Sequence, residues 1–86
     1  MKIFDMKTAQ IDPDDNELMV SIGEKIRELR KQKNISYEKL AKEIGLDRNT
    51  VNLIELGKTN FQFQTLLSIL SYHKISVFDF FKSLEQ

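Results

Sequence analysis

The sequence lacks cysteine altogether and contains a single histidine, His73, among its 86 residues. The absence of cysteine excludes disulfide frameworks and thiolate metal sites. A lone histidine has no second ligand with which to share a metal ion, so we expect His73 to lie near the free carbonyls of a helix C-terminus. No Ser/His/Asp or Cys/His set, paired carboxylates or phosphate-binding glycine loop stands out. We therefore expect no metal, no cofactor and no enzymatic activity.

Long apolar runs are also missing. No stretch approaches the ~20 residues that a membrane-spanning helix requires, and the first residues, MKIFDMKTAQID, lack the basic start and apolar stretch of a signal peptide. We therefore expect a cytoplasmic protein with no membrane partner. Apolar residues make up 41% and charged residues 30% of the chain, which favours one folded domain. A domain of this size buries only roughly 60–65% of its surface, so dimerisation would add stability.

The chain has no net charge, because 13 basic residues balance 13 acidic ones. Residues 1–21 hold two lysines against five carboxylates, a net charge of −3, whereas residues 22–86 hold eleven basic and eight acidic side chains, a net charge of +3. A mildly basic body is compatible with nucleic-acid binding, although a clustered basic surface is the usual footprint. The acidic extension before it is available to a protein partner.

The start of the chain divides into an arm and a long helix. Residues 1–13 show no sustained period and predict an N-terminal arm, either flexible or containing a short strand. Asp14 followed by Glu17 forms a capping box that predicts a helix start, and the helix should end near residues 33–34. Apolar residues then recur at steps of four, four and three along one buried stripe: Leu18, Ile22, Ile26 and Leu29.

Residues 37–56, YEKLAKEIGLDRNTVNLIEL, predict two short helices joined by a tight turn. Ser36 can cap the first helix, Gly45 supplies the left-handed residue that ends it, and Asp47 can cap the second. Apolar residues at helical spacings let the two helices pack across the turn: Leu40, Ala41, Ile44, Val51 and Ile54. This is the pattern of a helix-turn-helix, whose second helix commonly enters the DNA major groove.

Two further helices are predicted after this unit. Gly57 ends the second helix of the unit, and the apolar spacing over residues 63–74 predicts the next one. Ser76 followed by Asp79 predicts the start of the last helix. The sequence thus predicts an all-α, five-helix domain over residues 14–86, preceded by the short arm.

The stretch from Ile22 to Phe81 resembles the five-helix DNA-binding domain of the lambda-repressor and Cro family. The resemblance is carried by IGEKIRELRKQKNIS, by YEKLAKEIGLDRNTVNLIELGKTN, and by the pair QTLLSIL and ISVFDFF. It implies a lambda-repressor-like fold. It also implies a sequence-specific transcriptional regulator, a repressor or controller protein, that binds double-stranded DNA as a homodimer on a near-palindromic operator.

Base reading requires side chains near the N-terminal end of the second helix of the motif, because that end enters the groove first. Arg48 can bond both acceptors of guanine, Asn49 can pair with adenine, and Asn52 lies on the same outward face. The alternative is that these three are merely solvated. Leu53 stands where family members usually place a polar reading residue, and it can contact a thymine methyl group or a neighbouring subunit.

Phosphate contacts are the second requirement, because they set the register on DNA and supply most of the salt-dependent affinity. Tyr37 stands where the family often has a phosphate-binding glutamine, and its hydroxyl can serve the same purpose unless its ring packs against the core. Thr50 can reach a phosphate or bond locally. The loop after the reading helix matches family positions that touch the DNA backbone: Lys58, Thr59 and Asn60.

Two further residue groups have expected structural roles, one within the motif and one in the proposed dimer. Glu55 follows Ile54 at the end of the reading helix. The resemblance implies that it braces the motif through an ion pair or hydrogen bond with a basic residue of the first helix, such as Arg30. In the last helix, Val77, Phe81 and Leu84 share one core-facing side. Phe78 and Phe80 cannot both lie on that side, so we predict that they form the dimer interface. The alternative is that both are buried under the N-terminal arm.

A second class of function is consistent with the same fold. A protein-interaction module or the antitoxin of a toxin–antitoxin pair would have weak or no autonomous DNA binding. The zero net charge, the acidic arm, and the leucines Leu53 and Leu56 on the reading helix favour this alternative.

Overall fold

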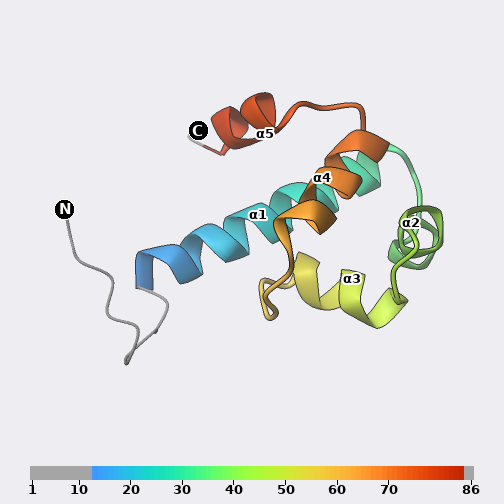
Figure 1. Ribbon diagram of the computed structural model, residues 1–86, viewed down its shortest axis with the longest axis horizontal. Helices are drawn as coiled ribbons and strands as arrows, with labels where there is room; N and C mark the ends of the chain where they lie inside the picture. The colour runs from blue at the N-terminus through green and yellow to red at the C-terminus, as the bar shows by residue number, and fades with distance from the viewer. Residues whose placement is uncertain (1–12, 85–86) are drawn as a thin grey trace.

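The computed structural model describes residues 13–84 of the chain, and their side chains from residue 16 onward. It contains five helices (Figure 1): α1 Pro13–Gln32, α2 Tyr37–Ile44, α3 Arg48–Glu55, α4 Phe63–Tyr72 and α5 Val77–Ser83. No strand occurs among these residues, so the predicted all-α class is confirmed. None of these helices combines the length and the apolar character needed to cross a membrane. The predicted arm and its protein partner lie outside the described residues, except that Pro13 already belongs to α1.

The helix starts follow from side-chain caps that the sequence predicted. Ser36 Oγ accepts a hydrogen bond from the backbone N–H of Lys39 at 3.1 Å, and an Asp47 carboxylate oxygen accepts one from Asn49 at the same distance. Ser76 Oγ caps α5 in the same way, at 3.0 Å from the N–H of residue 79. Each cap satisfies an N–H group that has no partner within its helix, which explains why α2, α3 and α5 begin where they do.

The corners after α1 and after α4 have the same backbone conformation, which the sequence did not predict. Asn34 after α1 and Lys74 after α4 both adopt left-handed backbone conformations, with φ of 57° and 58°. In each corner an isoleucine N–H then bonds back into the preceding helix, from Ile35 to Arg30 and from Ile75 to Leu70. A capping serine follows each isoleucine, so the same local device turns the chain into α2 and into α5.

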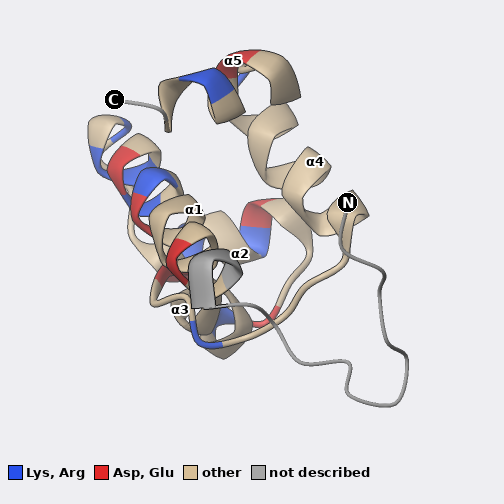
Figure 2. Ribbon diagram, turned by 90° about the vertical axis from the view of Figure 1, so that its left-hand side faces the viewer, with Lys and Arg blue, Asp and Glu red and all other residues tan. Residues whose placement is uncertain are grey.

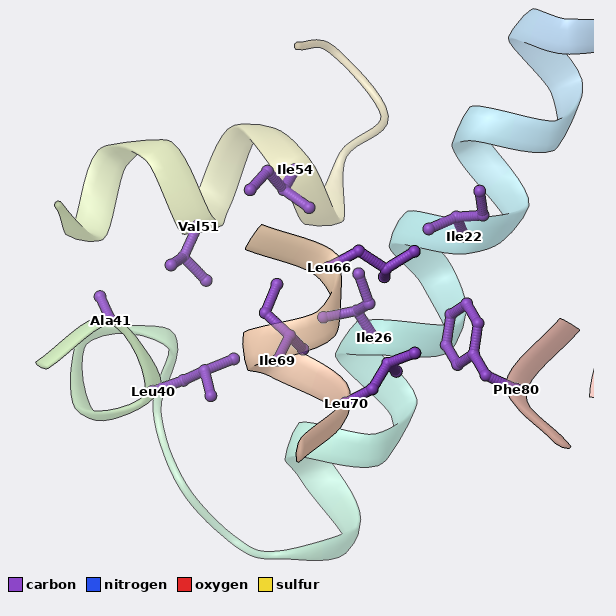
Figure 3. Packing of buried hydrophobic residues seen from close by; sticks show 10 residues of the cluster. All are labelled: Ile22, Ile26, Leu40, Ala41, Val51, Ile54, Leu66, Ile69, Leu70 and Phe80. Atoms are coloured by element: carbon purple, nitrogen blue, oxygen red, sulfur yellow. The ribbon is translucent and has the colours of Figure 1, made fainter. Parts of the chain in front are cut away.

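The hydrophobic core lies where α1, α2, α3 and α4 converge, and α5 closes it from the side (Figure 3). Its buried residues are Ile22, Ile26, Leu40, Ala41, Val51, Ile54, Leu66, Ile69, Leu70 and Phe80. The predicted stripe of α1 is confirmed at Ile22 and Ile26, but Leu18 is 43% exposed. The first turns of α1 therefore project beyond the core. The apolar stripe continues onto a part of α1 that no described residue covers.

Phe80 corrects one part of the sequence analysis. Its side chain is fully buried, and it reaches from α5 toward Ile22 of α1 and Leu70 of α4 (Figure 3). The prediction that Phe80 forms a dimer interface is therefore wrong, because its ring already fills the chain's own core. Val77, Phe81 and Leu84 are partly buried around it, so α5 has one core-facing stripe with Phe80 at its centre. Phe78 points elsewhere and is 77% exposed.

Candidate nucleic-acid interface

Helix α3 is positioned by the turn that follows α2. Gly45 has φ of 74°, a conformation that suits glycine, and its N–H bonds to carbonyls in the last turn of α2. The Leu46 N–H reaches Ala41 O at 2.8 Å, which tightens the turn before Asp47 caps α3. Val51 and Ile54 are buried on the inner side of α3. The opposite side of the helix faces outward, at the edge of the molecule (Figure 1).

The predicted base-reading residues occupy this outward side. Arg48 and Asn49, at the N-terminal end of α3, are both exposed. Asn52 and Leu53, one turn later, are half-buried, and Leu56 at the C-terminal cap is 46% exposed. Two of the polar candidates, Arg48 and Asn49, therefore lie at the N-terminal end of α3, whereas Asn52 lies one turn later beside Leu53.

The predicted phosphate-contacting residues lie on two other segments. Tyr37 opens α2; its ring packs against the core and lies 6.0 Å from the guanidinium carbon of Arg30. After α3, Lys58 and Asn60 are exposed, and the half-buried Thr59 donates a hydrogen bond to the Asn60 carbonyl at 3.2 Å. Thr50, the remaining candidate, is half-buried in α3 itself.

A buried ion pair joins α1 to the end of α3. Arg30 Nε and Nη2 donate to the two carboxylate oxygens of Glu55 at 2.7 and 3.0 Å, and Nη1 donates to Ile35 O at 2.7 Å. Only 9% of Arg30 and 6% of Glu55 is exposed. The bracing role expected of this pair is confirmed. One guanidinium thereby fixes the end of α3 and the corner that leads into α2.

The same crossing of α1 and α3 depends on Gly23, a residue that the sequence analysis left without a role. A Cβ at this position would lie 2.4 Å from Ile54 O and 2.6 Å from Glu55 O, far inside normal contact distance. A glycine directly beside a buried isoleucine on a helix is the sequence signal of such a close approach. The two helices therefore meet backbone to backbone.

The surface charge of α1 is mixed rather than basic. Figure 2 shows lysine and arginine alternating with acidic residues along this helix, and Lys25 pairs with Glu28 at 3.7 Å. Since Arg30 is used in the buried pair, α1 offers no purely basic strip to DNA. Helix α4, by contrast, carries no charged residue (Figure 2).

His73 lies at the C-terminal cap of α4, as expected. Its ring packs edge-on against Tyr72, and Lys33 Nζ lies 3.4 Å from the Tyr72 carbonyl oxygen and 4.4 Å from the Tyr72 ring centroid. Burial, together with the nearby Lys33 charge, lowers the pKa of His73 below its usual value. Within the described residues, no group of His, Cys, Asp or Glu side chains is arranged to hold a metal ion.

Comparison with known proteins places this geometry in a family. The helix-turn-helix family model matches residues 26–80. The control protein C.MunI from Mycoplasma sp is 33% identical over 72 residues, which span 83% of this chain and 97% of that protein.

Solved structures give the same result. The restriction-modification controller protein C.AhdI from Aeromonas hydrophila is similar with a TM-score of 0.72 and 33% identity, over 78% of this chain and 97% of that chain. The wild-type restriction-modification controller protein C.Esp1396I is similar with a TM-score of 0.70 and 28% identity, over 78% and 86% of the two chains. The α2–α3 unit of this chain, the exposed N-terminal end of its α3 and these similarities together show that the chain belongs to the lambda-repressor and Cro-type helix-turn-helix family of DNA-binding transcriptional regulators.

Proposed function

We propose that this protein is the controller of a restriction–modification system, binding a near-palindromic operator as a homodimer. The observation that carries the proposal is the exposed pair Arg48 and Asn49 at the leading end of α3, held on a rigid crossing with α1. The relatives that share this architecture across nearly their whole length are named as controller proteins. Because the similarity spans nearly the whole length of these relatives, it supports the same controller role for this chain.

In the proposed complex, the N-terminal end of α3 enters the major groove. Arg48 bonds guanine, and Asn49 bonds adenine, because both side chains are free to extend from the helix. Asn52 and Leu53 face the groove one turn later, where Leu53 offers an apolar surface to a thymine methyl group. These four residues would carry the sequence preference.

Backbone contacts would surround this reading surface. Lys58 and Asn60 extend from the loop after α3, with Thr59 between them, and supply cationic and polar groups to one phosphate strand. Tyr37 and Thr50 lie at or near helix N-termini, where free N–H groups attract phosphate oxygens. The Tyr37 ring packs against the core, so its contact would be made by the hydroxyl group.

The proposed dimer uses the outward side of α5. Phe78 is the most exposed large apolar residue among those described, and water contact with so large a ring is unfavourable unless a partner covers it. A two-fold interface would place two α3 helices about 34 Å apart, one turn of duplex. The operator would then be near-palindromic.

Selection from a random duplex library tests this proposal. The protein should enrich a two-fold symmetric sequence. Binding should weaken steeply with added salt, because phosphate neutralisation releases counterions. Enrichment of no sequence would contradict the proposal.

The alternative of a protein-interaction module or antitoxin rests on the apolar end of α3. Leu56 is 46% exposed and Leu53 is half-buried, so this end could contact protein as well as DNA. Salt-insensitive indifference to every duplex, together with a stable complex with another protein, would favour the alternative.

A further inference from the structure

Gly23 lies at the point where α1 crosses the end of the reading helix. A Cβ built on it would meet three backbone atoms of α3: Ile54 O at 2.4 Å, Glu55 O at 2.6 Å and Glu55 C at 2.9 Å. These are main-chain atoms, so no side-chain rotation can relieve the overlap. An ordinary contact begins near 3.4 Å, so any side chain here would push the end of α3 away by about 1 Å.

A second close approach lies one turn away on the same crossing. Gly57 follows α3 with φ of 71°, and a Cβ on it would lie 2.8 Å from the Cα atom of Val20. The Arg30–Glu55 ion pair provides a third attachment, two helical turns beyond Gly23 along α1. The end of α3 therefore contacts α1 through two backbone approaches and one bidentate hydrogen-bonded pair.

These attachments control the placement of the reading end. Helix α3 has only eight residues, about 12 Å of helix, so a displacement of its C-terminal end also moves Arg48 at its N-terminal end. A bidentate contact with a base needs correct placement of the whole side chain, whereas Lys58 can follow a phosphate by changing its own rotamers. A displacement of α3 should therefore reduce base discrimination more than it reduces general affinity for DNA.

We propose that Gly23 is a positioning residue for base readout: it lets α3 sit against α1 at the depth that correct base contact requires. The inference rests on the proposed base-reading role of α3. It concerns the ratio of affinities for a preferred and an unrelated duplex, which a purely structural glycine would leave unchanged.

The test compares Gly23→Ala with the unaltered protein on two probes. One is the duplex that the unaltered protein selects from a random library, and the other is a scrambled duplex of the same length and composition. Gly23→Ala should lower the affinity ratio between the two probes by about tenfold, the value of one good base contact. The salt dependence on the scrambled duplex should stay the same, because the phosphate contacts remain.

Lys74→Val is the control. Lys74 is exposed in the corner after α4, and its φ of 58° is unfavourable for a β-branched residue, so this variant loses stability without changing the α1–α3 crossing or the α2–α3 turn. It should keep the affinity ratio. An unchanged ratio in Gly23→Ala, or an equal loss in Lys74→Val, would overturn the inference. Failure of the unaltered protein to prefer any duplex would instead refute the proposed function.

Reduced folding of Gly23→Ala can be separated from the effect on readout. The measurements are made in sucrose, which favours the folded state by being excluded from the protein surface. Circular dichroism then gives the folded fraction. This fraction scales the affinities for the two duplexes alike and cancels in their ratio, so a lowered ratio reports a change in readout and not a loss of folded protein.

Discussion

Arg48 and Lys58 lie at opposite ends of α3 and have different expected roles. Arg48 is exposed at the helix start, where it can reach a base, and Lys58 is exposed in the loop after the helix, where it can reach a phosphate. Base contacts carry sequence information, whereas phosphate contacts carry affinity for any duplex. The two residues therefore allow the two parts of recognition to be measured separately.

Arg48→Ala should lower affinity for the selected duplex by about 1–3 kcal/mol and change little on a scrambled one. Lys58→Ala should weaken binding to both duplexes alike and reduce the slope of log affinity against log salt by about one. Fluorescence anisotropy titrations at several salt concentrations measure both effects. Unchanged selectivity in Arg48→Ala would mean that α3 does not read bases through this residue.

The buried Arg30–Glu55 pair contributes to stability in a way that an exposed pair does not. Removing Glu55 leaves a guanidinium with little access to water, so Glu55→Ala should cost about 3–5 kcal/mol of unfolding free energy. Glu43→Ala is the control: it breaks the exposed pair with Lys39, 3.4 Å apart, and should cost about 0.3–0.5 kcal/mol. Urea unfolding compares the two, and similar losses would argue against the bracing role.

At the scale of the elements, the ends of α1 and α4 are held together by the group of side chains around His73. Lys33 from the end of α1 donates to the Tyr72 carbonyl, and its ammonium lies over the Tyr72 ring. The neighbouring His73 Nε2 is buried and has no hydrogen-bond partner among the described residues. Protonation of that imidazole would add a cation to a site that already holds one.

The lowered pKa of His73 predicts a pH dependence of stability. The unfolded chain binds a proton below about pH 6.5, whereas the folded chain resists binding one. The stability that the neutral His73 imidazole contributes is therefore fully present above about pH 6.5. It is lost as the pH falls through the lower, folded-state pKa. His73→Gln should remove this part of the dependence below about pH 6.5, as urea midpoints would show.

Lys33→Met provides the control for this effect. It removes the second cause of the lowered pKa and leaves the burial of the imidazole in place. The pH dependence should become shallower than in the unaltered protein but should not vanish. Identical pH profiles for the unaltered protein and His73→Gln would exclude this histidine as the origin.

At the scale of the whole molecule, the exposed phenylalanines allow the proposed dimer interface to be located. Phe78 on α5 is 77% exposed and Phe63 on α4 is 59% exposed. Phe78→Ser should raise the dimer dissociation constant by about tenfold or more, as expected for an aromatic anchor at an interface. Phe63→Ser should leave it unchanged. Sedimentation equilibrium measures both variants.

The opposite pattern, with Phe63→Ser dissociating the dimer, would move the interface from α5 to α4. Neither substitution touches the core, so both variants should keep the unfolding free energy of the isolated chain within about 0.5 kcal/mol. A monomer at all concentrations would contradict the dimer itself.

Most of the fold was predictable from local sequence. Ser36, Asp47 and Ser76 begin helices because their side chains bond N–H groups two or three residues away, and Gly45 ends one because it adopts a positive φ. The outward placement of the proposed base-reading residues followed from the same local logic, since the face opposite Val51 and Ile54 must point outward. The bracing partner of Glu55 came instead from the family resemblance.

Which aromatic ring of α5 faces inward depended on packing between distant segments. Four of the five residues from Val77 to Phe81 are apolar, so periodicity alone permits more than one buried stripe. In the folded chain Phe80 is buried in the same core cluster as Ile22 and Leu70, whereas Phe78 is left exposed. The close approach at Gly23 is likewise a property of two helices about thirty residues apart in sequence. Local chemistry therefore determined where helices begin and end, and tertiary contacts decided which faces meet, because burial depends on neighbours that the local sequence does not contain.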